Sequence, residues 1–374
     1  MVMDYIDQLI SQLYLVKQPQ QAPERFIRAF KGLSPRLQGN AVPWHLTLPE
    51  KLYKAIERDK ERFHAELNNL NLAYLEDVYI PTQKVFDYLQ PAKINVERYQ
   101  QYSQLDQTGH IQSFKPNQDG YANIVEYDRV SNVTGRFKTV SGPMLLHLPK
   151  IYRSVLESRW KNNGTIVSLD YKSLEPRVLL ATCGTQPREA ERKDIYESVR
   201  LSLFQDNPEV NRDVVKKIVL SELYGAGIET LRQRLPNIRD LESTVGQIAD
   251  WFGLEAMRTK LYEQWKETGF RYITNFYGRR VKTETSHTLV NHYVQSTAVD
   301  VAMLGFLNIL QYVEELEKQE HIAPIFILHD ALILDIHENS FSLINGLCKL
   351  GSVDIKKLET TTFYMSTDKG FSTL

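Results

Sequence analysis

Residues 168–181 read SLDYKSLEPRVLLA, a stretch that begins like a buried strand and continues like an amphipathic helix. Asp170 stands at the junction, directly after the apolar run 166–169. Moving a carboxylate out of water is costly unless something cationic meets it. The position of Asp170 therefore predicts a cation at the end of this strand.

A second aspartate takes a similar position near the end of the chain. Residues 324–337, PIFILHDALILDIH, have two β-rich runs on either side of His329 and Asp330, which predicts a tight hairpin with an acid at its turn. Taken singly, each aspartate is explained more simply as the cap of a turn or a helix. The pair becomes informative together with the helix that lies between them in the sequence.

Residues 209–224, EVNRDVVKKIVLSELY, predict that helix. Four of its residues recur every four positions along one face, which is first cationic, then aliphatic, then aromatic: Arg212, Lys216, Leu220 and Tyr224. A nucleoside triphosphate presents phosphates, sugar and base in the same order. The two cations would hold the phosphates, and the other two residues would pack near sugar and base. The alternative is a surface helix with solvated cations and a core-facing Leu and Tyr.

The composition is that of an ordinary globular protein of 374 residues, with 42% hydrophobic residues and enough length for two or three lobes. Two cysteines, Cys183 and Cys348, are too few for a disulfide framework. Apolar runs are broken well short of a membrane span, and the start MVMDYIDQLI lacks the features of a signal peptide, so we expect a cytoplasmic protein without membrane contact. The net charge of −1 argues only weakly against nucleic acid, because acidic residues elsewhere can balance a local basic surface.

The first part of the chain predicts helices and connectors. Residues 46–90 have apolar residues at helical spacing, whereas residues 91–125 are polar and turn-rich, which predicts a mobile loop or a linker. Further on, residues 164–170 predict a strand. A helix is predicted from Leu174, with Ser173 as its N-cap and a proline in its first turn.

Six short motifs, in order, resemble those of the family A DNA polymerases, the bacterial DNA polymerase I type. DYKSLEPR (170–177) resembles motif A, usually close to Asp-Tyr-Ser-Gln-Ile-Glu-Leu-Arg. RDVVKKIVLSELYG (212–225) resembles motif B, and LHDALIL (328–334) is similar to motif C, commonly Val-His-Asp-Glu. Three smaller matches are TGRF (134–137), YGRR (277–280) and NHYVQSTAVD (291–300). The ordered set covers about 130–374 and is highly specific.

The resemblance implies an α+β fold of the right-hand polymerase type, with an antiparallel palm sheet that carries Asp170 and Asp330. It implies an N-terminal helical arm at 1–45, a shortened thumb-like helical region at 46–130, and palm and fingers at 131–374. The fingers would span about 186–275. It also implies a template-directed DNA polymerase that adds dNTPs to the 3′-hydroxyl of a primer on DNA.

The implied chemistry uses two Mg²⁺ ions, with Mn²⁺ as a substitute, held by Asp170, Asp330 and the carbonyl of Tyr171. One metal ion would lower the pKa of the primer 3′-hydroxyl, and the other would neutralise charge on the triphosphate and the leaving pyrophosphate. Lys216 matches the lysine that contacts the triphosphate and serves as a proton donor to pyrophosphate, and Arg212 would bind the same phosphates.

Further roles are implied residue by residue. Glu175 matches the glutamate that excludes a ribose 2′-hydroxyl, although a carboxylate that stabilises a helix N-terminus is an alternative interpretation. Tyr224 would lie beside the templating base pair, and Gly225 would let the template approach. The remaining matches are contacts with primer or template, or salt bridges of the palm: Arg136, Asn291, Gln295, His329, Arg279, Arg177 and Arg280.

Two departures from the family pattern leave the exact activity open. Leu220 stands where the family has Phe or Tyr, so the chain could be a polymerase with relaxed sugar or template choice, an RNA polymerase or a reverse transcriptase. Ala331 stands where an accessory Glu is usual. A catalytically inactive polymerase-like protein that binds nucleic acid is a further possibility, and an unrelated Mg²⁺-dependent phosphohydrolase would also explain the paired aspartates. If a phage encodes this chain, we expect the protein in the cytoplasm of the host cell.

The residues before Thr134 are too few for a thumb together with a proofreading domain. We therefore expect neither 3′–5′ exonuclease nor 5′-nuclease activity. Processivity would be low unless a replication accessory protein holds the chain on DNA.

Overall fold

The computed structural model describes residues 5–33, 44–183, 194–352 and 365–369. The chain forms two compact units, Met1–Glu76 and Asp77–Leu374. The described part of the N-terminal unit is helical, with α1 (Tyr5–Leu13), α2 (Glu24–Leu33), α3 (Trp44–Thr47) and α4 (Glu50–Asn68). The predicted domain boundaries at 45 and 130 stay predictions.

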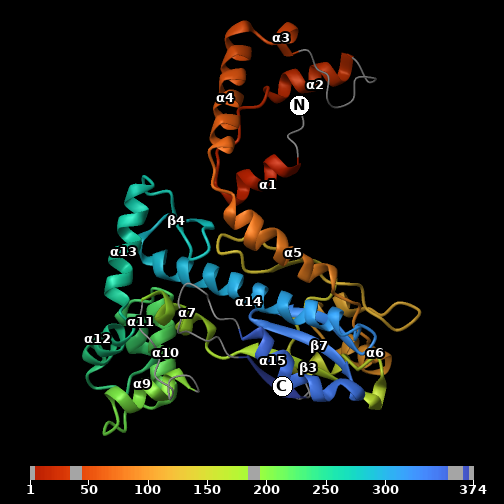
Figure 1. The fold of residues 1–374 in the computed structure, drawn as a ribbon, viewed down its shortest axis with the longest axis vertical. Coiled ribbons are helices and arrows are strands. Elements are labelled where there is room, and N and C mark those ends of the chain that lie inside the picture. Colours follow the sequence, from red (N-terminus) through yellow and green to blue (C-terminus); the bar gives the residue numbers. More distant parts are fainter. Residues whose placement is uncertain (1–4, 34–43, 184–193, 353–364, 370–374) are drawn as a thin grey trace. The chain divides into compact units, whose positions relative to one another are not determined.

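The C-terminal unit is built on a four-stranded antiparallel sheet in the order β6-β7-β3-β8 (Figure 1). Its strands are β3 (Gly164–Tyr171), β6 (Ile322–Leu328), β7 (Ala331–His337) and β8 (Met365–Lys369). Along β7, Leu332 and Leu334 join one apolar cluster, whereas Ala331 and Ile333 join a second cluster. Successive side chains of a strand point to opposite faces, so both faces of this sheet are covered. This explains why the strands read as nearly continuous apolar runs.

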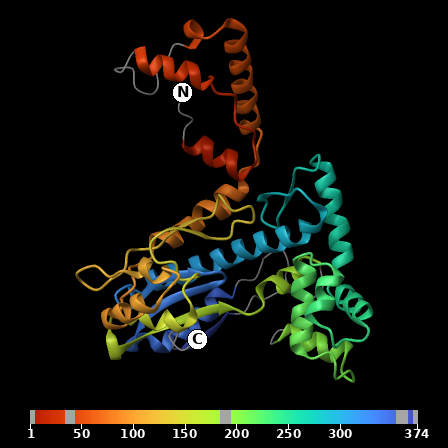
Figure 2. The same cartoon turned by 180° about the vertical axis from the view of Figure 1, so that it is seen from behind.

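One long helix, α14 (Leu289–Glu315), runs across the C-terminal unit and packs against α5, α7, α13 and α15 (Figures 1 and 2). With the turn before it, Ser286–Glu315 is long and apolar enough to cross a membrane, which the prediction of short, broken apolar runs did not anticipate. Its apolar window is 89% buried inside the protein. A helix that is hydrophobic all round suits the core of a large protein, and this position explains its composition.

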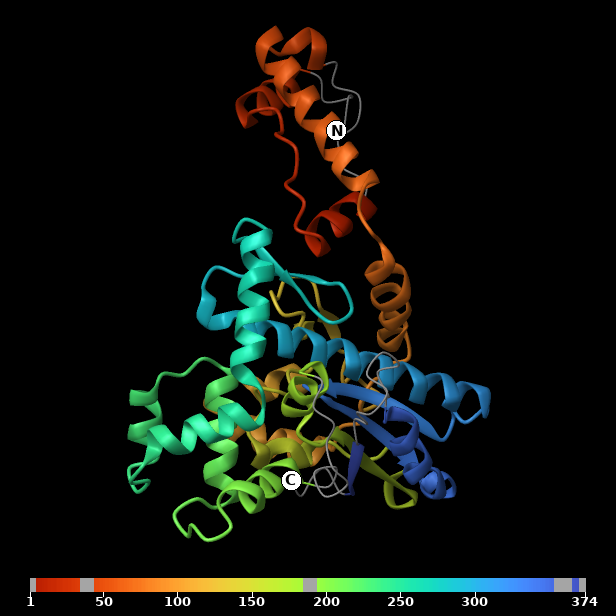
Figure 3. The same cartoon turned by 60° about the vertical axis from the view of Figure 1, so that its left-hand side comes forward.

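A group of helices gathers at one end of α14, and the sheet lies by its other end (Figure 3). This helical group follows the sheet strand β3 and helix α7 (Leu174–Thr182) in the chain. Its members are α9 (Ile195–Leu203), α10 (Arg212–Leu223), α11 (Ile228–Arg234), α12 (Leu241–Trp251) and α13 (Leu254–Glu267). Helix α10 confirms the helix predicted at 209–224, and it starts after Asn211, whose side chain caps the amide of Val214 (3.0 Å).

Smaller elements complete the C-terminal unit. The remaining helices there are α5 (Ile80–Asp87), α6 (Val96–Leu105) and α15 (Ile344–Gly351). Two short hairpins pair β1 (Glu126–Asp128) with β2 (Lys138–Ser141) and β4 (Tyr272–Thr274) with β5 (Arg280–Lys282). A short π-helix, η1 (Leu75–Tyr79), spans the boundary between the two units in the chain. The short 3₁₀-helices are η2 (His110–Phe114), η3 (Lys150–Val155), η4 (Lys161–Asn163), η5 (Ser286–Thr288) and η6 (Glu338–Leu343).

Two local predictions were wrong. Segment 91–125 is neither a free loop nor a linker, because it contains α6 and η2 and buries Ile111 and Phe114 completely in the second apolar cluster. Ser173 precedes α7 as predicted, but its side chain makes no capping hydrogen bond. Its φ of 52° is left-handed, whereas capping side chains act from an extended backbone.

A buried ion pair joins three elements of this unit. Arg129 Nη2 lies 2.9 Å from Asp300 Oδ1, and both side chains are fully buried. Thr82 of α5 accepts a hydrogen bond from Arg129 Nη1 (2.6 Å). Asn275, next to β4, donates to the other oxygen of Asp300 (2.7 Å). Asp300 of α14 therefore connects α5 and the β4–β5 hairpin to the central helix.

Candidate active site

The two predicted aspartates lie at the same end of the sheet. Asp170 pairs with Ala331, the first residue of β7. Asp330 directly precedes Ala331, in the two-residue turn between β6 and β7. The amide of Tyr171 donates to the carbonyl of Asp330 (3.3 Å). The predicted hairpin and the predicted strand are confirmed, and their pairing brings the two aspartates together.

The hairpin turn has an unusual backbone and a carboxyl group with a shifted pKa. His329 has a φ of 55°, which is uncommon for a residue other than glycine and clusters at functional sites. Burial raises the pKa of Asp330 to about 6, and the nearby Glu175 adds to the increase. Burial lowers the pKa of His329 below its ordinary value. The turn thus presents a carboxylate that lacks full solvation.

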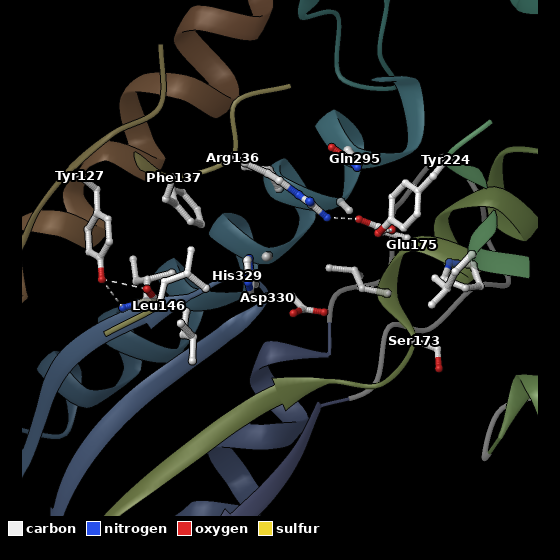
Figure 4. A pocket seen from close by; sticks show the side chains of 18 of the residues that line it. Tyr127, Arg136, Phe137, Leu146, Ser173, Glu175, Tyr224, Gln295, His329 and Asp330 are labelled. Carbon is white, nitrogen blue, oxygen red and sulfur yellow. Dashed lines mark hydrogen bonds and ion pairs between the residues drawn. The ribbon is translucent and has the colours of Figure 1, made fainter. Parts of the chain in front are cut away.

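A cavity of about 400 Å³ opens beside this turn (Figure 4). Asp330 lies in its centre, with Glu175 and Tyr224 to one side and Tyr127 and Leu146 to the other. The cavity brings together most of the predicted site residues, from the TGRF segment, α7, the region of α10, α14 and the hairpin: Arg136, Glu175, Lys216, Leu220, Tyr224, Gln295, His329 and Asp330.

Glu175 is held from two sides. Arg136 Nη2 lies 2.5 Å from Glu175 Oε1, and the hydroxyl of Tyr224 donates to Glu175 Oε2 at 2.7 Å. Burial raises the pKa of the Tyr224 hydroxyl, and the charge of Glu175 adds to the effect. These two contacts connect the TGRF segment, the start of α7 and the end of α10 at the cavity.

The two cations of α10 have different surroundings. Lys216 lines the cavity, whereas Arg212, one turn earlier, does not. Arg212 Nε lies 2.6 Å from Asp194 Oδ2. The buried ring of Tyr196 lies beside both, 5.5 Å from the guanidinium carbon of Arg212 and 6.0 Å from Lys216 Nζ. A cation over an aromatic ring is attracted by the electron density of its face.

Comparison with known proteins identifies the chain. The model of DNA polymerase family A matches residues 47–352. This chain belongs to DNA polymerase family A. No curated protein matches it. It resembles the solved structure of the POL domain of Pol1 from M. smegmatis in complex with DNA primer-template and dNTP, with a TM-score of 0.65 and 14% identity over 100% of this chain and 80% of that chain.

Membership of family A confirms three expectations. The protein is a DNA-directed DNA polymerase with the α+β polymerase fold, and its sheet is the palm. Family A polymerases use divalent metal ions. At 14% identity the likeness to the mycobacterial structure shows the fold alone. The roles of individual residues in this polymerase stay predictions.

Eight predicted site residues of this family A polymerase lie outside the cavity. Two of them are Arg177, which is buried and donates from Nε to the carbonyl of Lys172 (2.8 Å), and Arg280, the first residue of β5. Asp170 is half-buried at the end of β3, and the hydroxyl of Tyr171 points into the core, where it donates to the carbonyl of Gly351. Gly225 lines a separate cavity of about 660 Å³ beside α13. The other three are Arg212, described above, Asn291 and Arg279.

Asn291 and Arg279 differ in their hydrogen bonding. Asn291 lies one turn before Gln295 on α14, and its buried Oδ1 has no hydrogen-bond partner among the described residues. Buried acceptors in proteins usually have a partner, which includes ordered water. Arg279 is 4% exposed and donates to the carbonyls of Arg129 and Asn132, both at 3.3 Å. Its guanidinium also fills the space beside Gly135, so it braces the TGRF turn.

Sequence reasoning missed several residues of the cavity wall. Tyr127 donates its hydroxyl proton to the carbonyl of Ile327 (2.8 Å) and accepts from the amide of the same residue (3.1 Å). Phe137 and Tyr196 also line the cavity. Phe137 is the last residue of the TGRF motif and could have been found there. Tyr127 and Tyr196 carry no local pattern that marks them.

Proposed function

We propose that this polymerase transfers nucleotides from dNTPs to the 3′-hydroxyl of a primer on a DNA template, with Asp170 and Asp330 as ligands of two divalent metal ions. The observation that carries the proposal is that Asp170 of β3 and Asp330 of the β6–β7 turn lie at the same end of the sheet, with Asp330 in a cavity that also contains Lys216. The mycobacterial structure is named as a complex with DNA primer-template and dNTP, which supports the same partners here.

The donor set fits Mg²⁺. The described residues contain no group of three or more His, Cys, Asp or Glu side chains that could hold a metal ion. Mg²⁺ does not need such a group, because it is usually bound by one or two carboxylates together with water and substrate phosphates. Asp330 is a desolvated carboxylate that a cation would stabilise. When bound, the metal ions would lower the pKa of the primer hydroxyl and neutralise charge on the phosphates.

The other residues of the cavity would bind the nucleotide, orient its base and sugar, and exclude ribonucleotides. Lys216 would hold the triphosphate and protonate the leaving pyrophosphate. Tyr224 and Leu220 would pack against base and sugar. Glu175 would occupy the space of a ribose 2′-hydroxyl and thereby favour deoxynucleotides. The side-chain amides of Gln295 and Asn291 would donate hydrogen bonds to minor-groove acceptors at the growing end.

We also propose that synthesis by these 374 residues proceeds without proofreading. The family match that covers residues 47–352 is to a polymerase family. A primer with a mismatched 3′ end, incubated without dNTPs, tests the absence of proofreading. Removal of the mismatched nucleotide would contradict it.

We also propose that this polymerase acts in the cytoplasm and that a processivity partner holds it on DNA.

The test of polymerase function is extension of a labelled primer on a DNA template with Mg²⁺. The enzyme should extend with dNTPs, and Asp330→Asn should lose about 1,000-fold or more in rate, equivalent to about 4 kcal/mol of lost transition-state stabilisation. Asp250→Asn, the same change on the exposed side of α12, is the control and should extend normally. Normal extension by Asp330→Asn would contradict the proposal, and primer-template binding without any extension would favour a binding protein.

The same primer-extension assay, with rNTPs in place of dNTPs, would identify a polymerase that does not discriminate between ribose and deoxyribose. Leu220 lines the cavity where the family has an aromatic residue, so the packing on the sugar differs. Equal kcat/KM for dNTPs and rNTPs would show that Glu175 does not discriminate in this enzyme.

A further inference from the structure

Arg212 has an acidic partner that the family motifs do not predict. Asp194 is the N-cap of α9, and its Oδ1 accepts hydrogen bonds from the amides of Tyr196 and Glu197, both at 3.1 Å. Its other oxygen, Oδ2, accepts from Arg212 Nε at 2.6 Å. One carboxylate therefore caps the start of α9 and holds the first residue of α10.

This carboxylate occupies the Nε edge of the guanidinium, which is also an edge where a phosphate can bind. Guanidinium groups bind carboxylates and phosphates with the same forked geometry, so one anion excludes the other from the same edge. Burial opposes ionisation of Asp194, but the hydrogen bond and charge of Arg212, together with the amides of Tyr196 and Glu197, lower the pKa of the carboxyl. Asp194 is therefore a charged competitor at neutral pH.

The Arg212–Asp194 ion pair is exposed enough to solvent for another anion to replace Asp194. The side chains of Arg212 and Asp194 are 44% and 38% exposed, and ion pairs of this kind are weak because water solvates both charges. A triphosphate carries several negative charges and can displace a single carboxylate. Lys216 already lines the cavity one turn away, so an anion bound there lies within reach of a released Arg212.

We propose that Asp194 is a positioning residue that sets nucleotide affinity: it holds Arg212 in the nucleotide-free polymerase, and the incoming triphosphate displaces it. This inference rests on the proposed function, because it assigns Arg212 to the phosphates. Its consequence is selection by phosphate charge. A monophosphate or diphosphate brings less charge to compete with Asp194, so the pair favours triphosphates.

Asp194→Asn is the decisive variant. Asparagine caps a helix as well as aspartate does, so α9 keeps its start while the negative charge is lost. KM for dNTPs should fall about 3–10-fold, with kcat and the Kd for primer-template changed less than twofold. In the Arg212→Ala background, Asp194→Asn should have no effect, because Asp194 acts through Arg212.

The matched control is Asp213→Asn. Asp213 lies 3.7 Å from the same guanidinium but is 78% exposed, so this variant removes one nearby charge without releasing Arg212. Its KM should change less than twofold. A KM that rises in Asp194→Asn would mean that Asp194 presents Arg212 to the phosphates, and an unchanged KM would mean that the pair only joins the helices. Either result overturns the inference.

A binding measurement separates this inference from the proposed function. Inorganic tripolyphosphate, titrated calorimetrically into the free protein, needs no catalysis. Its Kd should fall 3–10-fold in Asp194→Asn, even if the protein extended no primer. A Kd that does not change overturns the competition between Asp194 and phosphate, whatever the polymerase assay shows.

Discussion

Replacing Asp300 by alanine should lower the free energy of unfolding by about 3–5 kcal/mol, because it leaves a buried guanidinium without its counter-charge. The side chains of Asp300 and Arg129 are fully buried, with Arg129 Nη2 at 2.9 Å from Asp300 Oδ1. The variant also removes the acceptor of Asn275 Nδ2 (2.7 Å), so two buried donors lose their partner together.

The assay is urea unfolding followed by tryptophan fluorescence. Three of the four tryptophans lie in the C-terminal unit that contains the pair: Trp160, Trp251 and Trp265. The midpoint for Asp300→Ala should fall while the slope stays the same. Asp250→Asn is the control and should stay within about 0.5 kcal/mol, because its side chain is exposed.

A double variant tests the cause. Arg129→Met with Asp300→Leu leaves no buried charge and should recover most of the lost free energy, because uncharged pairs of similar volume often replace buried ion pairs without loss. The reasoning is refuted if Asp300→Ala costs less than about 1 kcal/mol, or if the double variant is no more stable than Asp300→Ala.

Three further predictions concern the site. Burial raises the folded-state pKa of Asp330 from 3.8 to about 6. Its contribution to stability is therefore present below pH 3.8 and is lost as the pH rises through 6. Between pH 4 and 7, the urea midpoint of Asp330→Asn should decline less than that of the unsubstituted protein. Gly225→Ala should cost about 1–2 kcal/mol, because φ is +69° and the new Cβ would lie 2.6 Å from the carbonyl oxygen of His287, whereas Gly246→Ala in the exposed interior of α12 should raise the melting temperature. Glu175→Ala should reduce the preference for dNTPs over rNTPs in kcat/KM about 10–100-fold, and exposed Glu255→Ala should leave it unchanged; an unaltered ratio in Glu175→Ala would remove the sugar role.

Local pattern was enough to predict the elements that carry the site. The strand before Asp170, the hairpin around Asp330 and the helix from Arg212 each show in a window of a few residues, because periodicity and turn residues are local properties. Polar, turn-rich composition was a poor guide for segment 91–125. A few apolar residues, such as Ile111 and Phe114, are sufficient to fix such a segment in the core.

Tertiary pairing could not be predicted in the same way. Asp300 meets Arg129 across 171 positions, and Glu175 meets Arg136 and Tyr224 across 39 and 49 positions. No periodicity spans these separations. Sequence patterns therefore predict the helix or strand in which each residue lies, but not the residue that it contacts. The motifs assigned Arg212 to phosphate for the same reason: the competing carboxylate of Asp194 stands outside motif B.

Because the proposed metal site combines two aspartates from different parts of the chain, metal binding would report on how the sheet assembles. Asp330 sits in a two-residue hairpin, which closes early because its strands are adjacent in the chain. Asp170 comes from a strand far earlier in the sequence, so its pairing with β7 carries the entropy of closing a long loop. A refolding experiment followed by Mn²⁺ binding should therefore detect the ion only after the slow, non-local pairing of β3 with β7, later than the signal of the hairpin itself.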